Sequence, residues 1–455
     1  MEYGRFADRL RLPTATDRRS SLAGLGAGIY AVTLLLVLAG ALGVMSAEYG
    51  SLAVFVAIVV LLVGLASTDL ALLPVLAFPA TLVMIRTGPL SVSDLVLIAA
   101  VVPALLLYRR DEAKDLQPLI WAGIAYQAFL VPTLILNPYL GNYVEWVHEL
   151  FLVVGSLVVG WVIGRRDKAR VALSLFTAGC VGIAIAALMQ AFYVLGTTGT
   201  FGPAYLPFLH KNFIGNSLAF AFLIAFVRPD WLRWSRGTSY LVMGVCAAGI
   251  AASNSRQAIV SVFAAVIFLG FRGRTKVSTR GRVLTIALIP AIVAALSSVG
   301  EQLESGDAFN STAQRLSWYA ESLVIWRISP MFGVGLRWWN TGDYSSFQPP
   351  NAFLEMLSSG GLLGLIGFIV LCVTSLWIVL LLPRQYSDLA SAIMIARFAQ
   401  GQLDLFWVAG QSALPWMVAG LVIGVRALHY EWEGPGETRA AGFVRHSAPR
   451  AGGSR

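Results

Sequence analysis

The chain has 455 residues, of which 57% are hydrophobic and only 13% are charged, with a formal net charge of +9. A soluble globular domain carries about 25% charged residues, so this composition excludes an ordinary soluble protein. Repeated apolar runs near the roughly 20 residues that cross a bilayer predict an all-α polytopic membrane protein. The positive charge does not predict nucleic-acid binding, because the basic residues cluster in short loops, where they set the orientation of membrane helices.

The apolar runs divide the chain into a basic N-terminal tail (1–21), a large membrane region (22–299), a polar loop (300–351), a second membrane region (352–427) and a C-terminal tail (428–455). The candidate spans are roughly 22–45, 51–67, 69–85, 92–108, 118–136, 144–163, 171–194, 212–227, 238–253, 257–271, 283–299, 361–382, 388–404 and 411–427. The segment 51–85 fits a shallow hairpin as well as two crossings, and 388–404 is interrupted by Arg397. We therefore expect roughly 12 to 14 spans.

The distribution of Lys and Arg predicts the orientation of these spans. With the N terminus inside, most basic residues fall on the inner side, which predicts cytoplasmic termini and an extracytoplasmic 300–351 loop. Six basic residues fall on the outer side, where the orientation rule does not explain them: Arg86, Lys211, Arg256, Arg315, Arg327 and Arg337. The C-terminal tail is rich in Gly, Pro, Ala and Arg and is predicted to be disordered.

The polar loop contains a predicted amphipathic helix at about 312–327. Leu316, Tyr319, Ala320 and Leu323 follow the i, i+3, i+4, i+7 pattern, and Pro330 stops the helix. Such a helix is expected to lie along the membrane surface, with Trp318 on the same face as Arg315. The glycine- and aromatic-rich segment after it, which includes Trp338, is suited to stacking on sugar rings.

Three of the outer basic residues suggest a binding site for a lipid-linked diphosphate. Arg256 lies in a tight polar turn, Lys211 lies beside a span, and Arg315 lies on the predicted loop helix. Arginine binds phosphate oxygens bidentately and remains charged when it is partly desolvated. We expect Arg256 and Arg315, assisted by Lys211, to hold the diphosphate; the alternative is that each side chain only reaches toward lipid headgroups.

Two outer histidines, His210 and His148, are candidates for a general base, although each could equally be an interfacial residue with a single hydrogen bond. Asp404 lies near the end of a span, where an ionisable group needs a protein or water partner; it could pair with an arginine or take part in the site. The sequence shows no outward carboxylate cluster with metal-ligand spacing, so the predicted chemistry needs neither a metal nor a cofactor. Cys180, Cys246 and Cys372 fall inside apolar spans and are expected to be packing residues.

These residues resemble motifs of the O-antigen ligase/O-antigen polymerase superfamily. Ser253-Asn254-Ser255-Arg256 is similar to its Ser-x-Ser-Arg turn, and Arg315 with Trp318, Pro330, Gly333 and Gly335 is similar to its pattern Arg-x-x-Trp…Pro-x-x-Gly-x-Gly. Asn351, Leu354, Gly360, Leu363 and Gly364 are similar to the end of its motif His-Asn-x-x-Leu…Gly-x-x-Gly. Leu403–Trp407, with Trp416 and Gly420, is similar to its closing spans. The resemblance covers about residues 200–420.

The resemblance implies a GT-C-like helical fold and an inverting glycosyl transfer from a polyprenyl diphosphate. In the family the histidine that opens the last motif takes the acceptor's proton, but here that position is Pro350, and proline has no side chain that accepts a proton. Either His210 or His148 replaces this histidine, or the acceptor needs no such base, or the chain has lost the activity.

The predicted function is therefore a glycosyltransferase of ligase or polymerase type at the outer face of a bacterial cytoplasmic membrane. Its partners would be the lipid bilayer, a polyprenyl-diphosphate-linked glycan donor, and a glycan or glycolipid acceptor. The alternatives are a transporter or flippase of lipid-linked glycans and an inactive relative that only binds the carrier. Transporters often contain internal repeats, and the sequence shows none.

Overall fold

The computed structural model describes residues 67–87, 90–200, 202–272, 279–286, 311–344 and 347–443, together with the isolated positions 64, 288, 289, 293 and 297. The predicted spans at 22–45 and 51–67, and most of the span at 283–299, lie outside these ranges. Residues 1–70 and 71–455 separate into two units, and the following description concerns the second unit.

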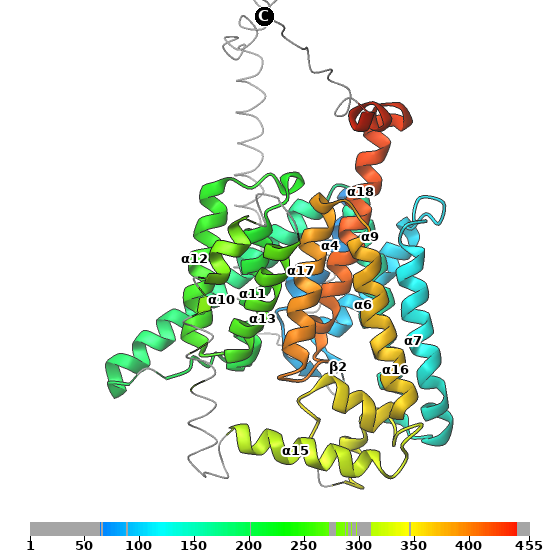
Figure 1. Cartoon of the computed structure of the whole chain (residues 1–455), viewed down its shortest axis with the longest axis vertical. Coiled ribbons are helices and arrows are strands. Elements are labelled where there is room, and N and C mark those ends of the chain that lie inside the picture. Colours follow the sequence, from blue (N-terminus) through cyan, green and yellow to red (C-terminus); the bar gives the residue numbers. More distant parts are fainter. Residues whose placement is uncertain are drawn as a thin grey trace, which may run out of the picture. The chain divides into compact units, whose positions relative to one another are not determined.

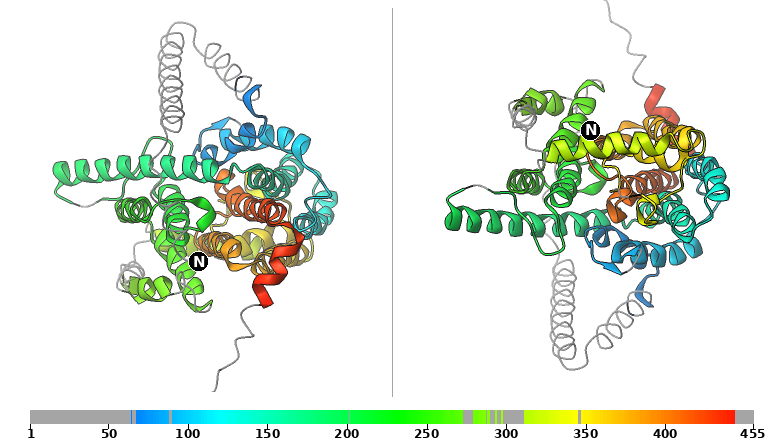
Figure 2. Two further views of the ribbon diagram at one scale, coloured as in Figure 1. Left: turned by 90° about the horizontal axis from the view of Figure 1, so that it is seen from above. Right: turned by 90° about the horizontal axis from the view of Figure 1, so that it is seen from below.

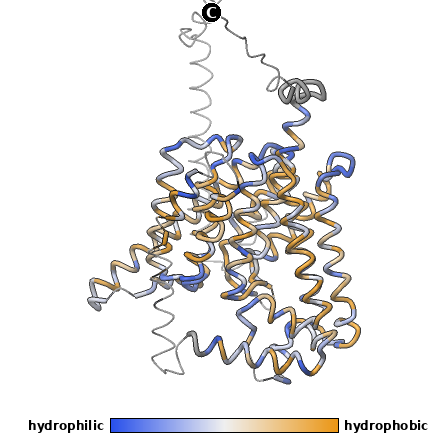
Figure 3. Tube along the Cα trace, viewed as in Figure 1, coloured by the Kyte–Doolittle hydropathy of each residue, from blue (hydrophilic) through white to orange (hydrophobic). Residues whose placement is uncertain are grey.

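This unit is built almost entirely from helices whose middles are apolar and whose ends are polar (Figures 1 and 3). The main helices are α6 (Val92–Leu107), α7 (Gln117–Leu136), α8 (Leu140–Leu150), α9 (Ser156–Arg165), α10 (Ala169–Thr198), α11 (Lys211–Val227), α12 (Arg236–Ser253), α13 (Arg256–Phe271), α15 (Ser311–Trp326), α16 (Ala352–Leu380), α17 (Arg384–Gly401) and α18 (Ala409–Phe443). A π-helical turn, Phe151–Gly155, joins α8 to α9, and 3-10 turns occupy Asp230–Leu232 and Trp338–Asn340.

Five helical segments in the described part of the chain are long and apolar enough to cross a bilayer. They are Gln117–Leu136, Leu140–Arg165, Ala169–Thr198, Ala352–Leu380 and Gly410–Glu431, and α6, α11 and α13 are shorter apolar helices. This arrangement confirms the prediction of a polytopic helical membrane protein. The interrupted segment at 388–404 also forms a helix, α17, which is buried along most of its length.

Close packing of α9 against α18 comes from glycines spaced four residues apart on both helices. A Cβ atom added at Gly160 would lie 1.9 Å from the carbonyl oxygen of Met417, and one added at Gly420 would lie 2.1 Å from that of Leu157. Only glycine allows the two backbones to approach this closely, as in other membrane helix pairs with the small-xxx-small pattern. The centre of the bundle is further filled by α11, whose residues from Phe213 to Val227 are all buried (Figure 2).

The structure refines the sequence reading in two places. Residues 69–85 do not form a span: they form two single turns, α4 (Leu72–Val75) and α5 (Ala77–Ala80), followed by the short antiparallel strands β1 (Arg86–Thr87) and β2 (Leu90–Ser91). Pro74 and Pro79 lie within these two turns, and each removes one backbone N–H donor from them. At the other end, α18 continues to Phe443, so the predicted disordered tail is helical in its first part.

The cysteines behave as the sequence predicts. Cys180 and Cys246 are buried in the core, Cys372 is partly buried, and all three are free thiols.

Candidate functional site

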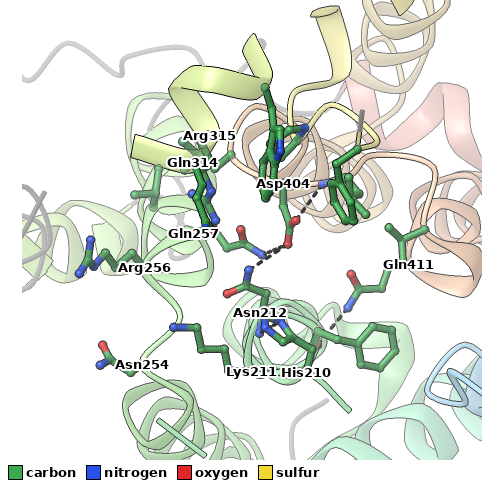
Figure 4. Close-up of a pocket in the computed structure, with 18 of the residues that line it drawn as sticks. His210, Lys211, Asn212, Asn254, Arg256, Gln257, Gln314, Arg315, Asp404 and Gln411 are labelled. Carbon is green, nitrogen blue, oxygen red and sulfur yellow. Dashed lines mark hydrogen bonds between the residues drawn. The ribbon is translucent and has the colours of Figure 1, made fainter. Parts of the chain in front are cut away.

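A cavity of about 660 Å³ opens at the end of the bundle over which α15 lies crosswise (Figure 1). Segments far apart in the sequence line it: the start of α11, the turn between α12 and α13, the first part of α15, the residues before α16, and the connection between α17 and α18. Its polar lining residues, all labelled in Figure 4, are His210, Lys211, Asn212, Asn254, Arg256, Gln257, Gln314, Arg315, Asp404 and Gln411.

The turn between α12 and α13 places Arg256 at this cavity. Asn254 ends α12 in the left-handed conformation (φ 49°), which asparagine tolerates better than most residues, and α13 then begins at Arg256. Lys211 is likewise the first residue of α11. The positive ends of both helix dipoles therefore add to the charges of these two side chains. The tight polar turn predicted at Ser253–Arg256 thus places the N-terminal end of α13 at the cavity.

The three predicted cations line the same cavity, with the side chain of Arg256 extending away from Asp404 (Figure 4). Lys211 and Arg256 lie on the same side of it, and Arg315 reaches it from α15 (Figure 4). Lys211 interacts electrostatically with both arginines, so each arginine is close enough to repel the Lys211 ammonium group. A bound anion would relieve this repulsion.

Asp404 provides the cavity's negative charge. Its Oδ2 accepts hydrogen bonds from Gln257 Nε2 at 2.7 Å and Asn212 Nδ2 at 3.2 Å, and its Oδ1 accepts one from the backbone N–H of Leu405 at 2.9 Å. These donors hold the carboxylate in one orientation at the centre of the group (Figure 4). Among the described residues, neutral amides hold Asp404 in place of an arginine, the pairing that the sequence left open beside a role in the site.

His210 precedes α11 and caps its first turn. Its Nδ1 accepts a hydrogen bond from the backbone N–H of Asn212 at 3.3 Å, which assigns the proton of the neutral ring to Nε2. Its pKa lies below the ordinary value because of desolvation, with a further lowering by Lys211 and Arg315, while Asp404 opposes the shift. The ring is therefore neutral at pH 7, with one nitrogen that lacks a proton.

The loop helix α15 closes the cavity with an aromatic wall. Trp318 stacks on Phe347 with ring centroids 4.9 Å apart, and both residues line the cavity together with Pro350. The hydroxyl of Tyr319 donates a hydrogen bond to the carbonyl oxygen of Pro350 at 3.3 Å. The position that carries a histidine in the resembled motif is thus at the cavity, although proline occupies it here.

Asn351 connects two of the segments that line the cavity through its side-chain hydrogen bonds. Its Oδ1 accepts hydrogen bonds from the backbone N–H groups of Phe353 and Leu354 at 3.0 and 3.1 Å, which caps α16. Its Nδ2 donates to the carbonyl oxygen of Gln402 at 3.1 Å. Asn351 therefore ties the start of α16 to the connection that carries Asp404.

The glycine-rich motifs form a structural junction rather than a lining of the cavity. Gly361 breaks α16 with φ 65° and ψ −161°, and residues 330–335 pack against the break. The backbone N–H groups of Val334 and Gly335 donate to the carbonyl oxygens of Ser358 and Ser359 at 3.0 and 2.9 Å. The loop thus supplies hydrogen-bond partners where the helix cannot.

Three predicted site residues lie outside the cavity lining: Asn351, described above, His148 and Trp338. His148 is buried on α8, where its Nε2 lies 3.0 Å from Asp94 Oδ1 and its Nδ1 lies 3.2 Å from Glu145 Oε2. These carboxylates leave neither nitrogen open to a substrate hydroxyl. Trp338 is fully buried against Ile325 and Val334, so its indole faces are not open for stacking on a sugar.

Four lining amides were not predicted from the sequence: Asn212, Gln257, Gln314 and Gln411. Three of them directly follow or precede a predicted cation, which is the one signal that could have indicated them. Gln411 has no predicted cation beside it in the sequence. Its Nε2 donates hydrogen bonds to the carbonyl oxygen of Phe213 and to Ser217 Oγ, both at 3.0 Å.

Within the ranges that the structure describes, no three His, Cys, Asp or Glu side chains are arranged as metal ligands. Metal-independent chemistry stays a prediction.

Part of the chain matches a known protein family. Residues 241–369 match the family model described as O-antigen ligase, a range that includes Arg256, Arg315, Asn351 and the glycine junction but not His210, Lys211 or Asp404. A search of curated proteins found no match. Residues 241–369 are therefore similar to the O-antigen ligase family, within a chain that is built as a multi-pass membrane protein.

Proposed function

We propose that the protein is a membrane glycosyltransferase of ligase or polymerase type, which moves a glycan from a polyprenyl diphosphate to a glycan or glycolipid acceptor at the outer face of the cytoplasmic membrane. The observation that supports this most strongly is the meeting of Arg256, Arg315 and Lys211 at one cavity. Two of these residues lie within the matched O-antigen ligase range.

In this proposal the cations bind the diphosphate of the donor. Arginine suits phosphate oxygens because its planar guanidinium donates two parallel hydrogen bonds, and the starts of α11 and α13 add positive potential. These charges stabilise the leaving group more strongly as the bond to the sugar breaks, because negative charge then accumulates on the diphosphate. The aromatic wall of Trp318 and Phe347 offers a stacking surface to the sugar.

The transfer is a single displacement. The acceptor hydroxyl oxygen forms a bond to the anomeric carbon, the bond from that carbon to the diphosphate oxygen breaks, and the polyprenyl diphosphate leaves with the electron pair. Attack from the face opposite the leaving group inverts the anomeric configuration. The hydroxyl proton goes to a base in the cavity.

We assign this base to His210. Its Nδ1 lacks a proton, and its 3.3 Å contact with the backbone N–H of Asn212 is long enough for a substrate hydroxyl to compete with it. The Asp404 carboxylate interacts electrostatically with the ring and would stabilise the imidazolium that forms. His148 does not take part in this scheme because two carboxylates occupy its ring nitrogens.

The test is a transfer assay with purified protein in liposomes, using a polyprenyl-diphosphate glycan as the donor and run with and without a chelator. Arg256→Ala and Arg315→Ala should each lower the transfer rate by about 100-fold or more, as expected when a charge that stabilises the transition state is lost. Arg327→Ala is the matched control, because Arg327 lies on the same outer loop and is exposed outside the cavity lining.

Several outcomes would contradict the proposal. Undiminished transfer in either cavity variant would remove that arginine from the site. Movement of the lipid-linked glycan across the bilayer without transfer would instead support a transporter. Binding of the carrier with neither movement nor transfer would support an inactive carrier-binding relative.

A further inference from the structure

A chain of buried charges lies outside the cavity and joins three parts of the protein. Asp94 of α6 pairs with His148 of α8 at 3.0 Å, His148 pairs with Glu145 at 3.2 Å, and Glu145 also forms an ion pair with Arg337 of the loop between α15 and α16. The exposed fraction of these four side chains is between 4% and 14%. Burying four ionisable groups is costly unless each is paired, and here each one is.

The loop residue Arg337 has an unusual backbone. Its φ of 58° lies in the left-handed region, which a residue with a long side chain rarely occupies without compensation. The ion pair with Glu145 supplies such compensation. The strained backbone and the buried partner are independent signs that this contact orients the loop.

Further hydrogen bonds hold the same loop from the side of α7 and α8. Asn142 Oδ1 accepts a hydrogen bond from the backbone N–H of Leu336 at 2.9 Å, and the hydroxyl of Tyr139 donates to the carbonyl oxygen of Leu336 at 2.6 Å. From the other side, the broken part of α16 accepts the hydrogen bonds of Val334 and Gly335. The loop is thus clamped between α8 and the break in α16.

The clamped loop in turn carries α15. Trp338, the residue after Arg337, packs against Ile325 of α15 and donates a hydrogen bond from its Nε1 to Ser358 Oγ at 3.2 Å. Trp326 Nε1 donates to the carbonyl oxygen of Pro330 at 3.0 Å. Because Arg315 is on the same helix as Ile325, the placement of the loop affects the placement of Arg315 at the cavity.

We propose that Asp94, His148, Glu145 and Arg337 form a positioning device, by which helices from the first half of the chain hold α15 and Arg315 over the cavity. None of the four residues touches the substrate in this proposal; they act through the loop and α15. The expected effect of changing these residues on transfer rests on the proposed function. The expected effect on the hydrogen exchange of α15 does not.

The test measures hydrogen–deuterium exchange and transfer kinetics in the same preparations of full-length protein. Glu145→Gln keeps the shape of the side chain and removes its charge, and Arg337→Gln removes the partner charge without leaving a buried cation. The matched control is Asp388→Asn, which breaks another partly buried pair, Arg272–Asp388 at 2.9 Å, between α13 and α17. A double variant, Glu145→Gln with Arg337→Gln, tests whether the two residues act together.

Each single variant should speed exchange across residues 314–340 by about tenfold or more, while residues 211–227 exchange as in the wild type. The double variant should be less affected than the sum of the two single variants, because it leaves no unpaired charge between them. Asp388→Asn should leave residues 314–340 unchanged. Transfer by Glu145→Gln should show a lower kcat/KM, with a pH profile like that of the wild type, since the base is intact.

Unchanged exchange at 314–340 in both single variants would overturn the proposal. Faster exchange spread equally over 211–227 and 314–340 would also overturn it, because the charges would then support the whole bundle. If Glu145→Gln does not fold, Arg337→Gln decides the question. If the variants change exchange at 314–340 but the wild-type protein shows no transfer activity, the positioning role is supported and the proposed function is refuted.

Discussion

At the scale of single residues, the site separates opposite charges with neutral amides. Asn212 and Gln257 stand next in sequence to Lys211 and Arg256, and both donate to Asp404. An amide donor fixes a carboxylate without neutralising it, so Asp404 stays available to a neighbouring ring while the cations stay available to an anion. A direct ion pair between Asp404 and an arginine would have cancelled both charges.

His210 makes the site sensitive to pH. Its pKa is lowered by desolvation and by the nearby cations Lys211 and Arg315, so the folded protein binds this proton more weakly than the unfolded chain does. The contribution of the ring to stability is therefore present above the unfolded pKa of about 6.5 and is lost as the pH falls through the lowered value. In its proposed role as the base, the ring would be active only when it is neutral, so activity should follow the same direction.

We therefore predict that the transfer rate falls on acidification, with a midpoint below pH 6.5. His210→Asn should transfer more slowly at pH 7.5 and lack this acidic limb, while asparagine still caps α11. The measurement is kcat/KM between pH 5 and 8 for both proteins. An unchanged pH profile in the variant would assign the limb to another group.

At the scale of elements, the glycine-rich motifs form the break in α16 and the loop that packs against it. Gly333 has φ 72°, and a Cβ atom there would lie 2.2 Å from the carbonyl oxygen of Ser359. Gly361 has φ 65°, and a Cβ atom there would lie 2.4 Å from Met331. Both the backbone conformation and the space exclude a side chain at these positions. The glycines belong to the architecture that holds α15.

Gly333→Ala should consequently destabilise the protein by about 1–3 kcal/mol, seen as a lower apparent melting temperature in detergent. Gly182→Ala is the matched control, because Gly182 lies within α10 and a Cβ atom there would meet nothing within 4 Å. That change should be neutral or stabilise by up to about 1 kcal/mol. Equal effects of the two substitutions would show that the close approach at Gly333 has no energetic importance.

At the scale of the whole molecule, the orientation of the chain decides which face the cavity opens to. The excess of basic residues on one side predicts that α15 is outside and that the turn before α12 is inside. In intact cells, a membrane-impermeant thiol reagent should label Ser317→Cys and should label Ser235→Cys only after lysis. Both serines are exposed, and wild-type protein, with Cys180 and Cys246 buried, gives the background. The opposite pattern would place the cavity on the cytoplasmic face.

Much of the fold follows from local patterns in the sequence. The apolar periods predict α7, α10 and α11 to within a few residues, because each helix satisfies its own backbone hydrogen bonds in lipid. The loop helix was predicted at about 312–327 and observed at Ser311–Trp326, since its pattern is local too. The sequence left the segment 69–85 open between a hairpin and a crossing, because hydrophobicity alone does not separate a membrane span from shorter apolar turns.

By itself, the sequence determined that this is a membrane protein, where most of its helices run, and that six basic residues, Arg256, Arg315 and Lys211 among them, are not explained by orientation. Those features depend on composition and on neighbours along the chain. Only the tertiary structure decided that Lys211, Arg256, Arg315 and Asp404 share one cavity, while His148 and Trp338 are buried elsewhere. Helix packing brings together residues nearly 200 positions apart, and contacts over that separation leave no periodic trace in one sequence.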